Sequence, residues 1–306
     1  MSNTDIQIYP TIPSRRVNQE GFYVREDVLY SNAKGREKDR LRKSALVVLD
    51  ALGDVLRRIL EKDETIFCIA PGQAMPGPIA QFFGSGWHSQ SIPRTILFLT
   101  DRRIIALRMR KRMSNWDWNR GIWTARWGDL ENVTADGFVS RYLTLKFRNR
   151  ETRRYWRFGW GDLKKIRLVI DTLRPHATGE STTAGGPVSL CPNCLAALTP
   201  GAYKCPSCSV EFKDEKTLLK RSLIVPGGAS LYVGASGLGV LRAIFESVIS
   251  ISILISLFEL TRAPKGSSAE ATLITGVVVE CAVLFVDKLL AYHLALRQVR
   301  DFIPID

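Results

Sequence analysis

Histidine is scarce in this chain, with three residues among 306. His88, His176 and His293 lie far apart in the sequence and belong to no recognisable motif. No Ser/His/Asp arrangement is visible, nor any pair of carboxylates with the pattern of a general acid and base. The sequence therefore offers no catalytic residues, and we expect a protein that is not an enzyme.

Nucleotide-binding motifs are missing as well. The glycine-rich stretch 234–239 has the order G-x-x-G-x-G and lacks the G-K-[ST] of a phosphate-binding loop. Its glycines are better suited to let helices approach closely or to bend the chain at a membrane interface.

Residues 1–10 lack the basic segment followed by an apolar run that marks secretion, so we expect no cleavable signal peptide. Acidic residues are in the minority, with 30 Asp and Glu against 43 Lys and Arg and a formal net charge of +13. This surplus indicates an acidic partner, either a membrane surface or nucleic acid.

Cysteine is also sparse, yet four of the six cysteines form a metal-ligand pattern of two C-x-x-C pairs ten residues apart: Cys191, Cys194, Cys205 and Cys208. Four thiolates in this spacing suit a tetrahedral Zn²⁺ site. A site closed by four protein ligands leaves no position for substrate, so the zinc would be structural. The alternative to a zinc site is a pair of disulfide bonds. Disulfides form in secreted proteins, and the expected absence of a signal peptide disfavours them here. Cys68 and Cys281 lie in apolar segments and are expected to be buried, inert thiols.

The first half of the chain predicts a helix followed by an antiparallel sheet. Residues 36–62 carry apolar side chains at helical spacing over a broad face. A second helix is predicted over 162–173, with Asp162 at its N-terminus. Residues 1–36 are polar and without periodicity, which predicts a flexible arm. Seven β-like segments lie between the helices: 65–70, 95–100, 103–108, 122–127, 130–135, 142–147 and 154–158.

Residues 94–108, with the sequence RTILFLTDRRIIALR, form two hydrophobic strands around a Thr-Asp-Arg-Arg turn. Together with the seven strands and the closing helix, this segment resembles the bacterial pleckstrin-homology-like domains. The resemblance covers roughly residues 63–175 and implies a PH-like antiparallel β-barrel or sandwich with a C-terminal helix. The Gly- and Pro-rich insertion 71–93 departs from the compact pattern.

The last third of the chain predicts a membrane hairpin. A flexible linker over 176–188 and the zinc ribbon over 189–213 lead into two apolar runs, 240–260 and 271–296. A helix over 237–260 would be about 36 Å long, enough to cross a hydrocarbon core of about 30 Å. Pro264 and Gly266 mark a short connection, so two transmembrane helices are expected within 214–306.

A motif P-G-G-x-x-x-Y-x-G precedes the first apolar run, in Pro226, Gly227, Gly228, Tyr232 and Gly234, and Asp287 lies late in the second. This part resembles bacterial membrane proteins of the small two-helix transmembrane type, for which it implies no catalytic role. More basic residues flank the two runs than lie in the loop between them. The positive-inside rule therefore predicts a multi-pass protein of the bacterial cytoplasmic (inner) membrane, with both termini in the cytoplasm.

Four of the charged residues inside the predicted spans are candidates for interaction between the two helices: Arg242, Glu246, Glu280 and Asp287. In an antiparallel hairpin, Arg242 is level with Leu290, close to Asp287 and His293, and Glu280 is level with Ser252. We expect an intramembrane polar cluster, with Glu280 protonated or hydrogen-bonded to serine. Pairing that fixes the hairpin register and a path for protons or ions in a homo-oligomer both remain open.

Cations and tryptophans are concentrated in the predicted sheet domain. This mixture suits anionic headgroups with indoles at headgroup level. It also suits a nucleic-acid backbone with bases stacked on tryptophan, or a solvated face that meets a protein partner. The candidate lipid or anion surface comprises Arg102, Arg103, Arg108, Arg110, Lys111, Arg112, Trp116, Trp118 and Arg120.

Taken together, the sequence predicts an α+β multidomain protein held in a membrane. Its expected parts are an arm (1–36), a helix with a PH-like domain (37–175), a linker (176–188), a zinc ribbon (189–213) and a transmembrane hairpin (214–306). The expected function is non-enzymatic recognition of anionic phospholipid or of a protein at the cytoplasmic membrane face. A membrane-attached nucleic-acid-binding protein and a small transporter or channel subunit are the alternatives.

Overall fold

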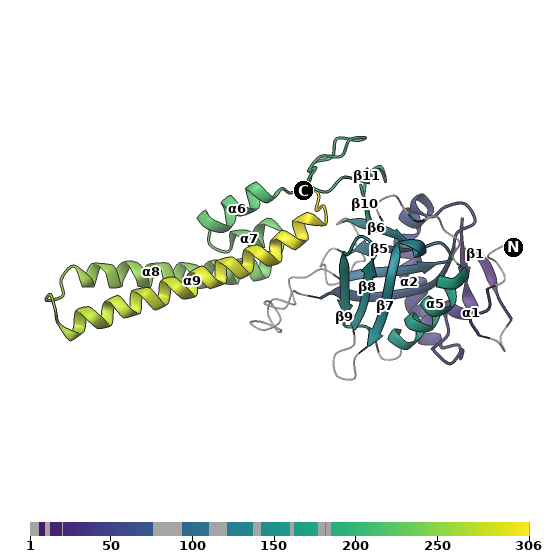
Figure 1. Cartoon of the computed structure of the whole chain (residues 1–306), viewed down its shortest axis with the longest axis horizontal. Coiled ribbons are helices and arrows are strands. Elements are labelled where there is room, and N and C mark those ends of the chain that lie inside the picture. The colour runs from purple at the N-terminus through teal and green to yellow at the C-terminus, as the bar shows by residue number, and fades with distance from the viewer. Residues whose placement is uncertain are drawn as a thin grey trace. The chain divides into compact units, whose positions relative to one another are not determined.

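The structure is a computed structural model that describes residues 6–9, 13–19, 21–75, 94–109, 121–136, 142–159, 162–176, 181 and 185–305. The described residues divide into two compact units. The first contains the residues up to Met75 and those from Arg94 to Val210, and the second contains those from Glu211 onward. Figure 1 shows both units.

The first unit is built on one large, mainly antiparallel sheet. Its strands neighbour one another in the order β11-β10-β6-β5-β4-β3-β9-β8-β7 (Figure 1). Two meanders, β3 to β6 and β7 to β9, join where β3 pairs with β9. The strands are β3 (Thr65–Ala74), β4 (Arg94–Thr100), β5 (Arg103–Arg108), β6 (Ile122–Arg126), β7 (Leu130–Asp136), β8 (Tyr142–Phe147), β9 (Thr152–Trp156), β10 (Val188–Leu190) and β11 (Ala197–Leu198).

Strand β4 is buried on both faces, which explains why its sequence is a continuous apolar run rather than an alternation. Leu97 and Leu99 belong to a core that includes the apolar side of α5 (Asp162–His176). Ile96 and Phe98 point into a second core, against α2 (Asp39–Ile59). The sheet is thus enclosed between these two helices.

The predicted elements of this region are present. Strands β3 to β9 match the seven predicted strands, with β9 shifted by two residues toward the N-terminus and β3 longer by four. Helices α2 and α5 match the two predicted helices. The structure is therefore of mixed α+β type with an antiparallel sheet. Beyond Met75, the insertion predicted over 71–93 lies outside the described residues.

The prediction of a flexible N-terminal arm is wrong for its described part. Strands β1 (Arg16–Gln19) and β2 (Phe22–Arg25) form a hairpin, and β2 adds parallel to β3. Helix α1 (Glu26–Leu29) follows, and the buried Arg25 donates two hydrogen bonds to Asp27. Strands of four residues are too short to show a periodicity, so composition alone suggested an unstructured segment.

The predicted linker does not separate the cysteine segment from the sheet. Strand β10 pairs with β6 through Val188, Ser189 and Leu190, and β11 extends the sheet further. The boundary between the two units falls after Val210 instead. A partner strand more than 60 residues away along the chain leaves no trace in local composition, which is why the linker was misread. Parts of the linker, 177–180 and 182–184, lie outside the described residues.

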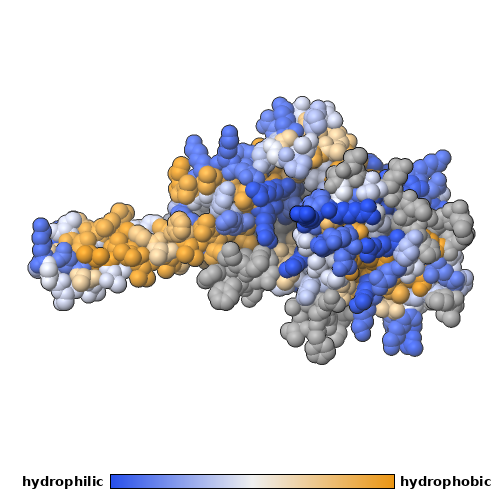
Figure 2. All heavy atoms as spheres, viewed as in Figure 1, coloured by the Kyte–Doolittle hydropathy of each residue, from blue (hydrophilic) through white to orange (hydrophobic). Residues whose placement is uncertain are grey.

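The second unit is helical within its described residues. It contains α6 (Glu215–Ile224), α7 (Gly228–Tyr232), α8 (Ser236–Leu260) and α9 (Ser268–Arg300). Helices α8 and α9 lie side by side and antiparallel, joined by a short connection (Figure 1). Figure 2 shows that apolar residues dominate the visible surface of this pair.

The two ends of the second unit are joined to each other. Phe212 and Pro304 form an isolated antiparallel bridge, and the backbone N–H of Lys213 donates to the carbonyl of Ile303 at 2.9 Å. The rings of Phe212 and Phe302 meet edge to face, with centroids 5.5 Å apart. The segment before α6 is therefore fixed to the segment after α9.

Candidate metal centre and charged helix pair

The four cysteines lie on two turns of the same construction. In each turn the residue after the second cysteine, Leu195 or Ser209, has a positive φ near 60°. Its N–H donates to the carbonyl of the first cysteine, at 2.9 Å from Leu195 to Cys191 and 3.0 Å from Ser209 to Cys205. Each turn therefore presents its two sulfurs on the same side, as a zinc knuckle does.

The four cysteine sulfur atoms form one compact cluster. All four Sγ atoms lie within 4.8 Å of one another. The Cys191 and Cys208 sulfurs are 3.5 Å apart, and those of Cys194 and Cys205 are 3.4 Å apart. These separations exceed a disulfide bond of about 2.05 Å. They are close to the roughly 3.8 Å edge of a tetrahedron whose metal–sulfur bonds are about 2.3 Å. The geometry fits a metal ion and excludes the disulfide alternative.

The thiols differ in how readily they lose a proton. Burial raises the pKa of Cys191 to about 12, whereas the backbone N–H of Val210 lowers the pKa of Cys208 to about 6. Because a metal binds thiolates, loading the site must release protons and will weaken as the pH falls. The four side chains fill a tetrahedral sphere, so the site is suited to stabilising the fold and offers no open position for chemistry.

Two of the predicted surface arginines are held in an ion-pair network at the β4–β5 turn. Arg103 donates two hydrogen bonds to the fully buried Glu64, at 2.8 and 3.0 Å. Arg102 donates to Glu61 at 3.0 Å, and Arg126 contacts the same carboxylate. Burial acts to raise the pKa of Glu61, but the hydrogen bond from Arg102 and the neighbouring guanidinium charges hold it below its usual range.

The third described member of that predicted surface, Arg108, is buried. Trp123 and Trp127 are buried in the sheet core, and the Trp127 indole donates to the Thr100 carbonyl at 3.0 Å. The described part of the predicted surface thus contributes to the fold rather than presenting free cations. Its remaining members, Arg110, Lys111, Arg112, Trp116, Trp118 and Arg120, lie outside the described residues.

Asp101, at the same turn, is expected to make the stability of the sheet pH-dependent. Its carboxylate accepts the N–H of Thr65 at 2.9 Å, and burial raises its pKa to about 6. An ordinary aspartate in the unfolded chain has a pKa of about 3.9, so the folded state binds the proton more tightly. The fold is therefore destabilised as the pH rises from about 4 through 6.

Asp101→Asn keeps an oxygen for the Thr65 N–H but cannot ionise. We expect it to raise the free energy of unfolding by about 1–3 kcal/mol at pH 7.5, with the gain disappearing near pH 4. Denaturant unfolding followed by tryptophan fluorescence at several pH values measures this difference. Asp50→Asn, on the exposed side of α2, serves as the control. A gain for Asp101→Asn that is independent of pH would contradict the assignment.

Helix α8 is the one helix among the described residues that is long and apolar enough to cross a membrane, with 25 residues and a mean hydropathy of 2.0 over its best window. The second predicted span, over 271–296, lies in α9, which does not meet this criterion of length and apolar composition. Helix α9 has 33 residues, but six charged side chains lie along it: Glu270, Glu280, Asp287, Lys288, Arg297 and Arg300. Cys281 on this helix is exposed, so its predicted burial is wrong.

The polarity of α8 is inverted relative to a helix of a water-soluble protein. Its buried residues are Gly239, Arg242 and Glu246. Ten of its exposed residues are large and apolar: Val240, Leu241, Ile244, Phe245, Val248, Ile251, Leu254, Ile255, Leu257 and Phe258.

The inward-facing charges are paired between the two helices. Arg242 lies 3.4 Å from Asp287, and Lys288 donates to Glu246 at 2.7 Å. Further along, the Ser252 hydroxyl donates to Glu280 at 2.7 Å, the contact expected from their equal depth. His293 instead contacts the neighbouring Tyr292 ring and joins neither pair.

Sequence reasoning missed Lys288 and Ser230. Lys288 is the partner of Glu246, and Ser230 accepts a hydrogen bond from Arg242 at 3.2 Å. The depth rule that placed Asp287 near Arg242 also places Lys288 near Glu246, so Lys288 could have been found. Ser230 could not, because it lies on α7, outside the predicted spans.

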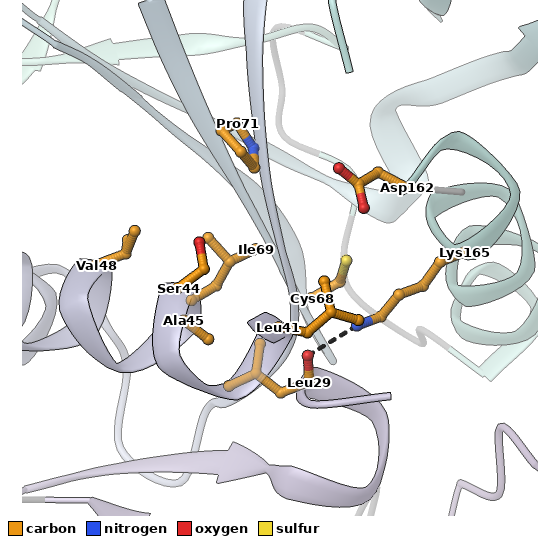
Figure 3. A pocket seen from close by; sticks show the side chains of 10 residues that line it. All are labelled: Leu29, Leu41, Ser44, Ala45, Val48, Cys68, Ile69, Pro71, Asp162 and Lys165. Carbon is orange, nitrogen blue, oxygen red and sulfur yellow. Dashed lines mark hydrogen bonds between the residues drawn. The ribbon is translucent and has the colours of Figure 1, made fainter. Parts of the chain in front are cut away.

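A small cavity lies in the first unit between α2, β3 and α5 (Figure 3). Its volume of about 70 Å³ is enough for a few water molecules. Lys165 is buried and lines this cavity, and its amine donates a hydrogen bond to the Leu29 carbonyl at 2.8 Å. Burial lowers the pKa of Lys165 and raises that of Cys68. Because this amine ties α5 to α1, we assign it a structural role.

Comparison with known proteins does not place the chain in a family. No protein-family model matches the sequence, and the comparison with curated proteins found no match. Among solved structures, one similar chain is the C-terminal domain of an unknown protein from Leishmania infantum. The two are 11% identical, the alignment covers 42% of this chain and 94% of that one, and the TM-score is 0.26. A likeness this weak carries no argument about fold or function.

Proposed function

We propose that this protein is a non-enzymatic membrane protein in which α8 and α9 cross the bilayer and the sheet unit recognises a partner at the cytoplasmic face. Zinc bound by the four cysteines stabilises the chain between the sheet and the membrane helices. Anionic phospholipid is the partner that we favour. The inverted polarity of α8 carries the proposal.

A bilayer explains that polarity and water does not. Ten large apolar residues are exposed on α8, while its buried positions hold a guanidinium and a carboxylate. In hydrocarbon the apolar side chains are solvated and charges must be paired in the interior of a helix bundle. We place α9 in the bilayer together with α8 for two reasons. Helix α9 supplies the polar partners of α8, Asp287, Lys288 and Glu280. It also exposes large apolar side chains: Val278, Val279, Val283 and Phe285.

Zinc is the metal that best fits the cysteine site. Four thiolates in a tetrahedral arrangement favour zinc or iron over harder ions. When bound, zinc would supply cross-linking and no catalysis. Since β10 leads directly into Cys191 and pairs with β6, the ion would stabilise an extension of the sheet.

The arrangement of the first unit supports the pleckstrin-homology-like interpretation. Strands β3 to β9 form seven antiparallel strands that one C-terminal helix covers, as that resemblance implied. Within it, Arg102, Arg103 and Arg126 are neutralised by Glu61 and Glu64. Recognition of anionic lipid therefore rests on the basic, tryptophan-containing sequence 110–120.

Alkaline carbonate extraction of membranes tests the attachment. The full chain should remain in the membrane pellet, whereas a chain ending at Val210 should be released. That shorter chain keeps both hydrophobic cores and the four cysteines, so it is expected to fold. Release of the full chain by carbonate would refute the membrane proposal.

Flotation of the shorter chain with vesicles then tests the partner. We expect binding to anionic but not to zwitterionic vesicles, with loss on replacing Arg110, Lys111 and Arg112 by glutamine, since each contributes about 1 kcal/mol near such a surface. Replacing the exposed Arg40, Lys43 and Lys62 removes the same charge and serves as the control. Absence of vesicle binding together with salt-sensitive nucleic-acid binding would favour the nucleic-acid alternative.

A further inference from the structure

The short helices α6 and α7 precede α8 and were not expected to enter the membrane. Their exposed residues near the intervening turn are apolar: Leu223 is 63% exposed, Ile224 69% and Val225 41%. The polar side chains Ser222 and Ser230 of the same helices are buried. At this turn the polarity resembles that of α8, whereas the rest of α6 exposes Lys216, Lys220 and Arg221 and buries Leu218.

Lys288 fixes the depth of this turn relative to the spanning helix. Its amine donates to Glu246 on α8 at 2.7 Å and to the Ser222 carbonyl near the end of α6 at 3.0 Å. Glu246 lies ten residues after the start of α8, which is about 15 Å along the helix axis. If α8 crosses a hydrocarbon core of about 30 Å, the end of α6 lies well inside it.

The other end of α6 lies near the start of α8. Lys213 donates through its amine to the Tyr232 carbonyl at 2.7 Å, and the Asp214 N–H donates to the Tyr232 hydroxyl at 3.0 Å. Tyr232 is four residues before Ser236, where α8 begins. The ten residues of α6 span about 15 Å, so the helix covers the same depth that separates Ser236 from Glu246.

Backbone at membrane depth must find its hydrogen bonds within the protein. Several backbone groups of this turn do so. The N–H groups of Val225, Gly228 and Leu231 donate to carbonyls of the same segment at 2.9–3.0 Å. Pro226 has no N–H that would need an acceptor. The carbonyl of Ser222 accepts a hydrogen bond from the Lys288 amine.

Glycine allows the turn to pack directly on α8. Gly227 has a φ of 64°, and a side chain there would overlap the carbonyl oxygen of Gly239 on α8. A side chain on Gly228 would overlap the Arg221 carbonyl. The P-G-G sequence is thus required for a tight return of the chain against the spanning helix.

Two of the three basic residues of α6, Lys216 and Arg221, can reach the headgroup layer. Lys216 lies in the first turn of α6 and is exposed. Arg221 lies deeper but places its guanidinium 5.1 Å from the centre of the Tyr232 ring, which belongs to the shallow end. Long basic side chains that extend toward the interface in this way keep their charge near lipid phosphates.

We propose that α6 and α7 form a re-entrant element that dips into the cytoplasmic leaflet and returns, with Leu223, Ile224 and Val225 in contact with lipid acyl chains. This inference rests on the proposed membrane insertion of α8. It adds a lipid-contacting surface that begins before the first span and is independent of the sheet domain.

Photo-crosslinking in native membranes tests the inference. A benzophenone amino acid replaces Ile224 in the full chain, in cells whose phospholipids carry an alkyne-tagged acyl chain. Ile251 on α8, 56% exposed, is the membrane control, and Lys216 is the control at the shallow end of α6. We expect lipid adducts at positions 224 and 251 and a several-fold lower yield at 216. The exposure of Ile224 makes a folding defect from this change unexpected.

The controls separate this inference from the proposal on which it rests. Lipid adducts at 251 without adducts at 224 would refute the re-entrant element and leave the membrane span intact. Failure at both positions would refute both. Crosslinks from 224 to a second protein chain instead of lipid would also overturn the inference, because the apolar turn would then be a protein interface.

Discussion

Cys205→Ser is expected to abolish metal binding and to unfold the segment from β10 to Val210. A structural zinc site contributes an apparent binding free energy of about 10–16 kcal/mol at neutral pH, and binding and folding of such a site are coupled. Apart from the pairing of β10 with β6 and β11, the cysteine segment has few apolar contacts that could replace the metal, since Leu190 and Leu195 are its members that pack against a main core. Metal analysis of the purified chain should fall from one zinc per molecule to a small fraction of that.

Limited trypsin digestion measures the accompanying unfolding. Lys204 directly precedes Cys205 and is exposed, so cleavage there should become rapid once the turn is released. Cys281→Ser removes an exposed thiol outside the metal set and should leave both readouts unchanged. Full zinc content in Cys205→Ser, with Lys204 still protected, would show that this cysteine is not a ligand.

Lys288→Met is expected to destabilise the helical unit by about 3–5 kcal/mol, because it leaves the buried Glu246 carboxylate without its cation. The same change removes the donor for the Ser222 carbonyl at the end of α6. Thermal unfolding in detergent and abundance in membranes should both fall. Lys265→Met, in the exposed α8–α9 connection, is the matched control.

The double variant Glu246→Met, Lys288→Met distinguishes pairing from a general loss of packing. Removing both charges leaves apolar groups of similar size, and buried ion pairs replaced in this way are often neutral in stability. We expect the double variant to recover most of the loss. A double variant as unstable as Lys288→Met alone would contradict the ion pair as the cause.

Local patterns in the sequence were sufficient for much of the architecture. The strands β3 to β9 were visible as segments bounded by turn residues, with continuous apolar runs in β4 and β5 and an alternation of apolar and polar residues in β8. The cysteine site was visible because knuckle spacing is a local property. The depth match of Ser252 with Glu280 followed from the geometry of an antiparallel pair.

Features that depend on distant partners were missed or misread. Arg102 and Arg103 looked like free surface cations, because Glu61 and Glu64 lie about 40 residues earlier in the chain. The pairing of β10 with β6 could not be read from a linker of Gly, Ser and Thr. The N-terminal strands are held by β3 and by the buried Arg25, and neither contact has a local signature.

The bridge between Phe212 and Pro304 has a mechanical consequence. A pull on the chain at Val210 is not transmitted to α6 alone, because the segments before α6 and after α9 are fastened to each other. The load is shared by two hydrogen bonds, Lys213 to Ile303 and Ile305 to Glu211, which would have to break together in shear. Helices α6 to α9 therefore form a loop that is closed at its base, and tension at Val210 acts first on these two hydrogen bonds.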